Sequence, residues 1–402
     1  MKALKKLMDK ARPAFEPGGK LHAFRSVYDG MDTFLFTPRE TSKSGVHIHD
    51  SMDSKRTMTI VIVALLPCLL FGMYNCGYQH WLAAGAETFP FWQLMLYGFL
   101  AVLPRIVVSY VVGLGIEFTV AQWRREEIQE GFLVTGILIP MICPIETPLW
   151  MIAVATAFSV IFVKEVFGGT GYNIFNVALV TRAFLFFAYP AQMSGDNAFV
   201  PREPILGLGM PVADTVSGAT PLGQIAVSGA TSASELSAAM TDLSGKAIDL
   251  WQMFVGLMPG SFAETSTLCI LIGAIILLAT GIASWRIVVS VFAGGAIMSL
   301  IAHWCATPLY PASYLSAGEQ LCLGGFAFAA VFMATDPVTS CRTNTGKYIY
   351  GFLVGAGAIL IRTSNTGYPE GAMMAVRLMN ALAPLIDYCV VEANVRRRMR
   401  RM

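Results

Sequence analysis

The segment Ser217-Gly218-Ala219-Thr220 carries a candidate functional hydroxyl. It follows Asp214 and lies in a polar stretch, about 191–260, that interrupts an otherwise apolar chain. A loop of this length without strong periodicity is usually functional or disordered. The two small residues before Thr220 leave its hydroxyl accessible and its backbone bendable. We therefore expect this segment to carry a function whose identity depends on the surrounding chain.

Ionisable residues inside the apolar segments form a second set of candidates. They are costly in a membrane and by default mark ion or substrate pathways. Several also have a structural interpretation, since Lys164 and Glu165 lie at a helix end, while Arg377 and Asp387 lie ten residues apart on one predicted helix. The set consists of Glu117, Lys164, Glu165, Arg182, Glu264, Asp336, Arg377 and Asp387.

Asp336 has a specific setting, because a short apolar segment ends at Ala334-Thr335-Asp336-Pro337. Unwound carbonyls beside a carboxylate suit a hard cation such as Na⁺. Glu117 and Asp387 end apolar segments on the predicted inner side, where a cytoplasmic ion could enter. Together these carboxylates indicate a cation pathway.

Two further clusters allow more than one interpretation. Gly113 and Gly115, close to Glu117, would let either a flat ligand or another helix approach the backbone. Aromatic residues near the end of the fifth apolar segment could form a slot for a flavin or quinone ring, or an aromatic belt at the membrane interface. These residues are Phe184, Phe186, Phe187 and Tyr189.

Cysteine and histidine patterns do not predict a metal centre. The eight cysteines are scattered and form no CxxC pair, which indicates neither a disulfide framework nor a cysteine-ligated cluster. His47 and His49 lack further ligands nearby. We expect no metal other than Na⁺.

Composition places these candidates in a membrane protein. Of the 402 residues, 55% are hydrophobic and only 13% are charged, whereas soluble domains carry about a quarter charged residues. The net charge of +2 gives no indication of nucleic-acid binding. The first fifty-odd residues are polar and contain no signal peptide, so insertion would use internal segments.

Apolar runs predict about ten transmembrane helices, five on each side of the polar stretch. The predicted segments are 57–75, 91–120 (broken at Pro104-Arg105), 131–143, 148–167, 176–190, 265–284, 285–305, 321–335, 348–362 and 371–391. The predicted organisation is an arm at 1–56, a membrane block at 57–190, a loop at 191–262, a second block at 263–392 and a basic tail at 393–402.

The two blocks resemble each other. Gly131-Phe132 and Gly325-Phe326 are 194 residues apart, and Thr170-Gly171-Tyr172 recurs 196 residues later at 366–368. Two matches in nearly one register predict a repeat, and an odd number of helices per repeat predicts that the halves have opposite orientation. The expected fold is therefore an all-α polytopic membrane protein of two inverted five-helix repeats with short broken helices.

The distribution of positive charge predicts the orientation. Placing the lysine-rich N-terminus in the cytoplasm puts nearly all basic loops on the inner side. Both termini are then cytoplasmic, and the loop that holds Thr220 faces the periplasm.

Several long motifs resemble the B subunit of the sodium-translocating NADH:quinone oxidoreductase. They are FEPGGK at 15–20, KEVFGGTG at 164–171 with Asn173 and Asn176, RAFLFFAYPAQ at 182–192, SGAT at 217–220, FMATDP at 332–337 and YPEG at 368–371. The match extends from the N-terminal arm to the basic tail.

This resemblance implies FMN joined through its phosphate to Thr220 by a separate flavin transferase, with Asp214, Ser217, Gly218 and Ala219 completing the motif. It also implies non-covalent riboflavin, ubiquinone as substrate, and five other subunits in a complex of the bacterial inner membrane. NADH would be oxidised on a partner protein of that complex, because Gly168-Gly169-Thr170-Gly171 lacks the strand–turn–helix context of a nucleotide site.

Other roles carried over by the resemblance concern quinone and sodium. The quinone region matches Gly113, Leu114 and Glu117, with leucine where the family pattern has a second glycine. The sodium pathway matches Glu117, Asp336 and Asp387, and also Asp29. The implied activity is electron transfer through FMN and riboflavin to ubiquinone, coupled to Na⁺ export.

Two alternatives follow from the same residues. Ser228-Gly229-Ala230-Thr231 repeats the motif, but the aspartate of the family pattern, three residues before the serine, is present only for the first copy, as Asp214. This favours Thr220 over Thr231. The related ferredoxin:NAD⁺ oxidoreductase complex has an equivalent subunit, and the repeat alone would also permit a passive channel or transporter for a small solute.

Overall fold

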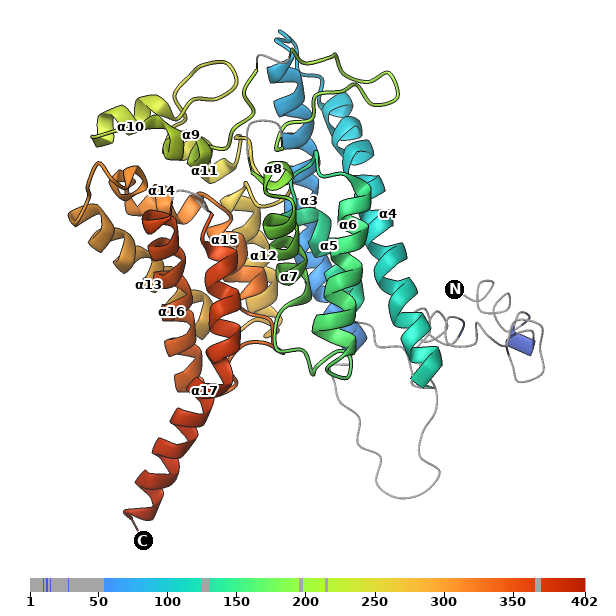
Figure 1. Ribbon diagram of the computed structural model, residues 1–402, viewed down its shortest axis with the longest axis vertical. Helices are drawn as coiled ribbons and strands as arrows, with labels where there is room; N and C mark the ends of the chain where they lie inside the picture. Colours follow the sequence, from blue (N-terminus) through green and yellow to red (C-terminus); the bar gives the residue numbers. More distant parts are fainter. Residues whose placement is uncertain are drawn as a thin grey trace.

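The computed structural model describes residues 10, 12, 13, 15, 28, 54–124, 131–194, 198–213, 216–365 and 370–401. Within these ranges the chain is helical, and its only β-type pairings are two isolated bridges. The prediction of an all-α polytopic protein is confirmed. Figure 1 shows helices that run roughly along the long axis, with shorter ones packed between and above them.

The first block begins with two long helices and continues with shorter ones. Because α4 remains continuous through Pro104, the predicted break at that residue is wrong. The helices are α3 (Ser54–Ala83), α4 (Phe91–Arg124), α5 (Phe132–Ile142), α6 (Leu149–Ser159), the π-helix η2 (Val160–Glu165), α7 (Val177–Ala188) and α8 (Pro190–Met193).

In its described residues after α8, the polar stretch contains three short helices that share a small apolar core. Leu222, Ile225 and Met253 pack there with Leu315 and Leu323, which belong to the second block. The polar stretch is therefore anchored to the membrane part. The helices are α9 (Pro221–Ser228), α10 (Ala233–Ala239) and α11 (Leu250–Val255).

The second block alternates long and short helices in a similar way. Its first helix is shorter than the predicted segment 265–284. The elements are α12 (Thr267–Ala279), α13 (Trp285–Trp304), the 3-10 turn η3 (Pro311–Tyr314), α14 (Ala317–Cys322), α15 (Phe326–Phe328), the π-helix η4 (Ala329–Met333), α16 (Asn344–Ser364) and α17 (Ala372–Met399).

Four helices are long and apolar enough to cross a membrane, and three shorter apolar helices accompany them in the described ranges. The long spans are Lys55–Ala83, Phe91–Arg124, Trp285–Trp304 and Ala372–Met399. The arrangement of ten helices as two inverted repeats stays a prediction.

The outward faces of the long helices are apolar. Val63, Leu66 and Leu70 on α3 and Val107 and Val111 on α4 are exposed. An aqueous protein rarely exposes such a continuous patch, whereas lipid tails solvate it. The exposed apolar face therefore fits a bilayer.

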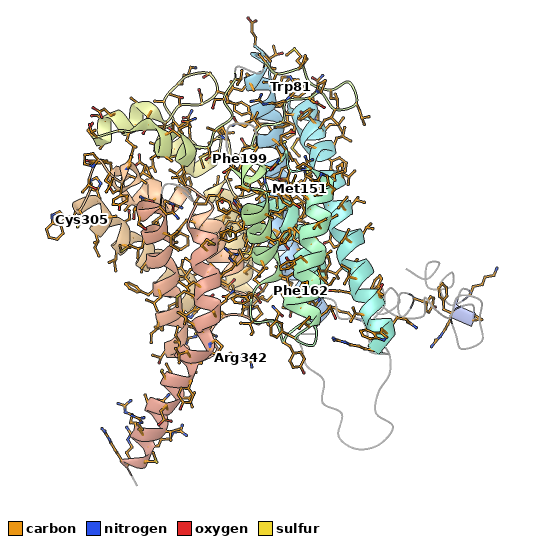
Figure 2. The ribbon with its side chains drawn as sticks, in the orientation of Figure 1. Trp81, Met151, Phe162, Phe199, Cys305 and Arg342 are labelled. Atoms are coloured by element: carbon orange, nitrogen blue, oxygen red, sulfur yellow. The ribbon has the colours of Figure 1, made fainter. Side chains whose placement is uncertain are left out.

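Arginine residues mark one end of the helical bundle. Arg124 ends α4 and Arg396–Arg398 lie in the last turn of α17, at the end where Figure 2 also places Arg342. The short helices α9, α10 and α11 lie at the opposite end (Figure 1). The Thr220 segment and the basic ends thus occupy opposite faces of the molecule.

Candidate functional site

Thr220 is the N-cap residue of α9. Its Oγ1 accepts a hydrogen bond from the Gly223 N–H at 3.1 Å, and Pro221 occupies the first helical position. Both features favour helix initiation. The segment therefore enters α9 with an extended backbone at Thr220, and the half-buried hydroxyl oxygen lies at the positive end of the helix.

Gln224 and Arg202 fix the backbone before Thr220. Gln224 donates to the carbonyls of Ala219 at 3.2 Å and Thr241 at 2.9 Å, and accepts from the Thr241 N–H at 2.9 Å. Arg202 donates to the Val216 carbonyl at 2.9 Å. These bonds hold the motif without engaging the hydroxyl hydrogen of Thr220.

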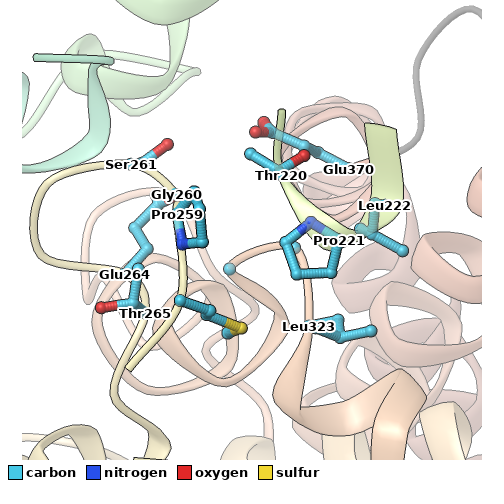
Figure 3. Close-up of a pocket in the computed structure, with 13 residues that line it drawn as sticks. Thr220, Pro221, Leu222, Pro259, Gly260, Ser261, Glu264, Thr265, Leu323 and Glu370 are labelled. Carbon is cyan, nitrogen blue, oxygen red and sulfur yellow. The ribbon is translucent and has the colours of Figure 1, made fainter. Parts of the chain in front are cut away.

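A pocket with an empty volume of about 370 Å³ adjoins Thr220. Figure 3 shows Thr220, Pro221 and Leu222 on one wall and Pro259, Gly260 and Ser261 on the opposite wall. Glu264, Leu323 and Glu370 also line it. The polar stretch therefore meets residues of the second membrane block at this pocket.

Arg182 lies in a buried ion cluster that reaches the pocket. Its Nη1 donates to Glu264 Oε2 and to Ser261 Oγ, both at 3.1 Å. The guanidinium also donates to the Glu370 carboxylate and the Ile142 carbonyl. Arg182 on α7 is thus bonded to residues immediately before α12 and α17, which joins the two blocks.

Arg362 extends this cluster from the other side. It donates to the Gln320 carbonyl at 2.6 Å, the Gln320 side chain at 2.9 Å and the Leu323 carbonyl at 2.9 Å. It also donates to the Glu370 carbonyl at 3.3 Å. Arg182 thus pairs with the carboxylates of Glu264 and Glu370, while Arg362 bonds to the backbone of Glu370.

The backbone next to the cluster requires glycine. Gly324 and Gly325 have φ values of 60° and 64°, a region that side chains disfavour. A Cβ on Gly325 would lie 2.8 Å from Glu264 Oε2, and one on Gly324 would lie 2.7 Å from Arg362 Nη2. The glycine pair therefore lets the start of α15 approach both charged groups.

Asp336 follows the end of η4 and contacts a residue of the first block. Its Oδ2 accepts from Asn176 Nδ2 at 3.0 Å and Thr339 Oγ1 at 3.2 Å, and its Oδ1 accepts from the Val338 N–H at 3.0 Å. Asn176 also caps α7, accepting from the Ala178 N–H at 3.0 Å. One asparagine thus links a short helix of the first block to the predicted cation ligand.

Asp387 binds the start of α16. Its Oδ2 accepts from the Arg342 N–H at 2.7 Å, and its Oδ1 accepts from the Thr343 N–H at 3.1 Å and hydroxyl at 2.5 Å. Asp336 and Asp387 therefore border the same connection, 336–343, at its two ends.

The predicted quinone residues lie in the first block. Gly113 is buried against the ring of Phe132, which fills the space where a side chain would extend. Leu114 packs at the edge of the main core. One turn beyond Gly113, Glu117 forms a buried ion pair with Lys164, whose Nζ lies 5.9 Å from the Phe132 ring centroid.

The aromatic cluster packs mainly against α6. Phe184 stacks on Phe158 with centroids 4.7 Å apart, and Tyr189 contacts Trp150 edge-on at 5.4 Å. Phe187 is 65% exposed. This arrangement favours the aromatic-belt interpretation over a ring slot.

The second motif has a different environment. The Thr231 N–H and hydroxyl both donate to Glu235 Oε2 at 2.8 Å, although Thr231 is exposed. These two bonds lower the pKa of Glu235 below its ordinary value. The Thr231 N–H and hydroxyl are thus both hydrogen-bonded to a carboxylate, whereas the Thr220 hydroxyl oxygen caps the N-terminus of α9.

The structure groups only some of the predicted residues. Ser217, Gly218, Ala219 and Thr220 form one segment, while Glu117 lies in a contact set separate from that of Asp336 and Asp387. Asp214, Asp29, His47 and His49 lie outside the described residues.

Sequence reasoning missed the partners Glu370, Ser261 and Asn176 as site residues. The only available signals were the motif YPEG and the asparagine that begins the fifth predicted apolar segment. Neither signal indicates which distant residue the side chain contacts.

Comparisons with known proteins cover almost the whole chain. Residues 41–396 match the NQR2, RnfD, RnfE family. Two relatives are named as the B subunit of Na(+)-translocating NADH-quinone reductase, and each is 39% identical to this chain over 99% of its length. The alignment covers 96% of the Chromohalobacter salexigens protein and 99% of the Pseudomonas aeruginosa protein. The homologue of that name from Azotobacter vinelandii is 38% identical over 99% of both chains. The chain therefore belongs to the NQR2, RnfD, RnfE family.

Proposed function

We propose that this chain is the membrane-embedded B subunit of a sodium-translocating NADH:quinone oxidoreductase. In this role it carries electrons from NADH, oxidised on a partner protein of the complex, to ubiquinone and couples their passage to Na⁺ export. The near full-length similarity to relatives of that name carries the proposal. The apolar outer face and long helices support a place in the bilayer.

Thr220 is the residue to which we assign covalent FMN. A phosphate on its Oγ1 would lie at the N-terminus of α9, whose first turn contains no acidic residue. Helix N-termini stabilise anions by about 0.3–1 kcal/mol at exposed positions. FMN would supply one- and two-electron redox chemistry, while the bonds from Gln224 and Arg202 hold its attachment point. We also propose a non-covalent riboflavin in the same chain.

Asp336, Asp387 and Glu117, together with Asp29, are proposed for the sodium pathway. Asp336 combines a carboxylate with the end of a π-helix, and its bond to Asn176 connects it to α7. Residues 336–343 connect Asp336 to the backbone groups that Asp387 binds at the start of α16. Binding of Na⁺ at one carboxylate would therefore change the position of the start of α16. The proposed coupling between ion and helix runs through this connection.

The quinone is proposed to bind near Gly113, Leu114 and Glu117. Phe132 fills the surface above Gly113, so a ring entering there must displace Phe132. Leu114, which stands where the family pattern has glycine, would narrow the same path.

The proposed location is the bacterial inner membrane, with both termini cytoplasmic and the Thr220 segment periplasmic. The basic ends of α4 and α17, opposite the helices α9–α11, support this orientation under the positive-inside rule. Five partner subunits and a flavin transferase complete the proposed system.

Flavin fluorescence on a denaturing gel tests the proposal. The complex would be produced in a host that has the flavin transferase. A fluorescent wild-type band and a dark Thr220→Ala band are expected, with Ser237→Ala, an exposed site outside the motif, as a fluorescent control. A dark wild-type band contradicts the redox proposal and favours a passive transporter. Na⁺-stimulated ubiquinone reduction by the purified complex separates it from the ferredoxin-linked alternative.

A further inference from the structure

The sequence contains two threonines in the same four-residue motif. Solvent exposure alone would favour flavin attachment at Thr231, whereas we assign it to Thr220. Thr231 is exposed, whereas Thr220 is half-buried. We propose that Glu235 blocks flavin attachment at Thr231 and so directs the modification to Thr220. This inference rests on the proposed function and names a residue that sets its specificity.

The group transfer defines what a competent threonine needs. Its Oγ attacks the flavin-side phosphorus of a flavin adenine dinucleotide, and a new P–O ester bond forms. The diphosphate bond breaks, AMP leaves, and the hydroxyl proton passes to a base of the transferase. The accepting oxygen must therefore be able to approach a doubly charged diphosphate and lose its proton.

Glu235 opposes this approach at Thr231. Its Oε2 lies 2.8 Å from both the Thr231 amide nitrogen and the Thr231 Oγ1. A phosphate on that oxygen would be forced against the carboxylate, and like charges at such short range repel strongly. The ester oxygen could also no longer donate to Glu235, so one charge-assisted bond would be lost.

Glu235 also places a negative charge at the start of the helix that follows Thr231. It is the acidic residue in the first turn of α10, where Ser232 is the N-cap and accepts from the Glu235 N–H at 3.3 Å. At α9 the corresponding turn has no acidic residue, and Pro221 follows Thr220 directly. The two helix starts therefore differ in the sign of charge that they present to an incoming anion.

The backbone before each motif strengthens the difference. Residues 221–228 are helical, so the second motif begins at the end of α9, and Gly229 caps that helix with a φ of 59°. Ile225, three residues before Ser228, is buried in the apolar core of the loop. A transferase thus meets a non-helical segment before Thr220 but a folded helix before Thr231.

The test uses the full chain in its complex, with four variants. They are Thr220→Ala, Thr220→Ala/Glu235→Gln, Thr220→Ala/Glu235→Gln/Thr231→Ala and the matched control Thr220→Ala/Glu319→Gln. Glu319 likewise lies in the first turn of a short helix, α14, where its Oε2 accepts from the Ser316 N–H at 2.7 Å. The control therefore removes an equivalent charge away from Thr231.

In-gel flavin fluorescence and fragment-ion mass spectrometry provide the readouts. Thr220→Ala and the Glu319 control should be dark. Thr220→Ala/Glu235→Gln should gain about tenfold or more flavin per chain, located on Thr231, because one charge-assisted hydrogen bond corresponds to at least that factor. The triple variant should be dark again.

Two outcomes overturn the inference while leaving the proposed function intact. One is a double variant as dark as Thr220→Ala, and the other is flavin on Thr231 in Thr220→Ala alone. A dark wild type instead contradicts the proposed function itself, so the two failures are distinguishable.

Discussion

His80 holds Met210 through a backbone hydrogen bond: the Met210 N–H donates to His80 Nε2 at 3.3 Å. The other ring nitrogen, Nδ1, lies 2.7 Å from the Pro201 carbonyl, to which it must donate. The fully buried ring also stacks on Tyr97 with centroids 4.3 Å apart. A neutral imidazole on α3 thus anchors the segment whose Arg202 contacts the Thr220 motif.

Replacing His80 with phenylalanine should loosen this segment. The stacking on Tyr97 would remain, while two hydrogen bonds of about 0.5–1.5 kcal/mol each would be lost. Faster hydrogen–deuterium exchange is expected at 201–212. His303→Phe, at an exposed site, should match the wild type. Unchanged exchange in His80→Phe would contradict the anchoring role.

Removing Arg182 should destabilise the junction of the two blocks. Arg182→Met leaves Glu264 buried without its partner, and breaking a buried pair costs about 3–5 kcal/mol. Thermal unfolding of the complex should therefore begin at a lower temperature. Arg182→Met/Glu264→Leu should recover part of the loss, since no buried charge is stranded at Glu264. Arg396→Met is the control, because its ion pair is 68% exposed on the arginine side and should contribute less than about 1 kcal/mol.

Asn176 and Asp336 should show energetic coupling. Asn176→Asp keeps an acceptor for the cap of α7 but replaces the donor to Asp336 with a second carboxylate. A destabilisation of about 1–3 kcal/mol is expected from the unsatisfied group. Adding Asp336→Asn restores a donor and an acceptor with the roles exchanged, so stability should partly return. A double-mutant cycle measures the coupling, and strictly additive effects would argue against the contact.

Gly113→Ala should collide with Phe132. Overpacking of this kind costs about 1–3 kcal/mol, and Phe132→Leu should relieve part of it. If the quinone enters here, the Michaelis constant for ubiquinone should rise in Gly113→Ala and fall back in the double variant. Gly115→Ala offers a matched control, because a Cβ there meets open space. Equal behaviour of the two glycine variants would exclude the proposed quinone path.

The bond between Thr231 and Glu235 should depend on pH with a defined sign. The pKa of Glu235 in the folded chain is lowered from its ordinary value of 4.5 by the hydrogen bonds from Thr231. The stabilisation is therefore complete above about 4.5 and is lost as pH falls through the lower, folded value. The protection factor of the Thr231 amide, which is its exchange rate corrected for the pH dependence of intrinsic exchange, should fall in that window, and Glu235→Gln should remove this pH dependence.

Local features of the chain were predictable because they depend on neighbouring residues. Low charge and long apolar runs predict membrane helices, and the polar stretch with its SGAT motif marks a candidate threonine. Pro104 misled the prediction, since a helix in lipid can remain continuous through a proline when neighbours support it.

By itself, the sequence determined the membrane class and the two candidate threonines, and it predicts a division into two apolar blocks. Only the tertiary structure decided which distant groups meet, because hydrogen bonds and ion pairs form without any fixed sequence spacing. Arg182 and Glu370 are 188 residues apart, and Asn176 and Asp336 are 160 residues apart. The two SGAT copies have identical letters and differ in sequence by the preceding aspartate, Asp214, but only folding shows the helix start beside Thr220 and the carboxylate beside Thr231.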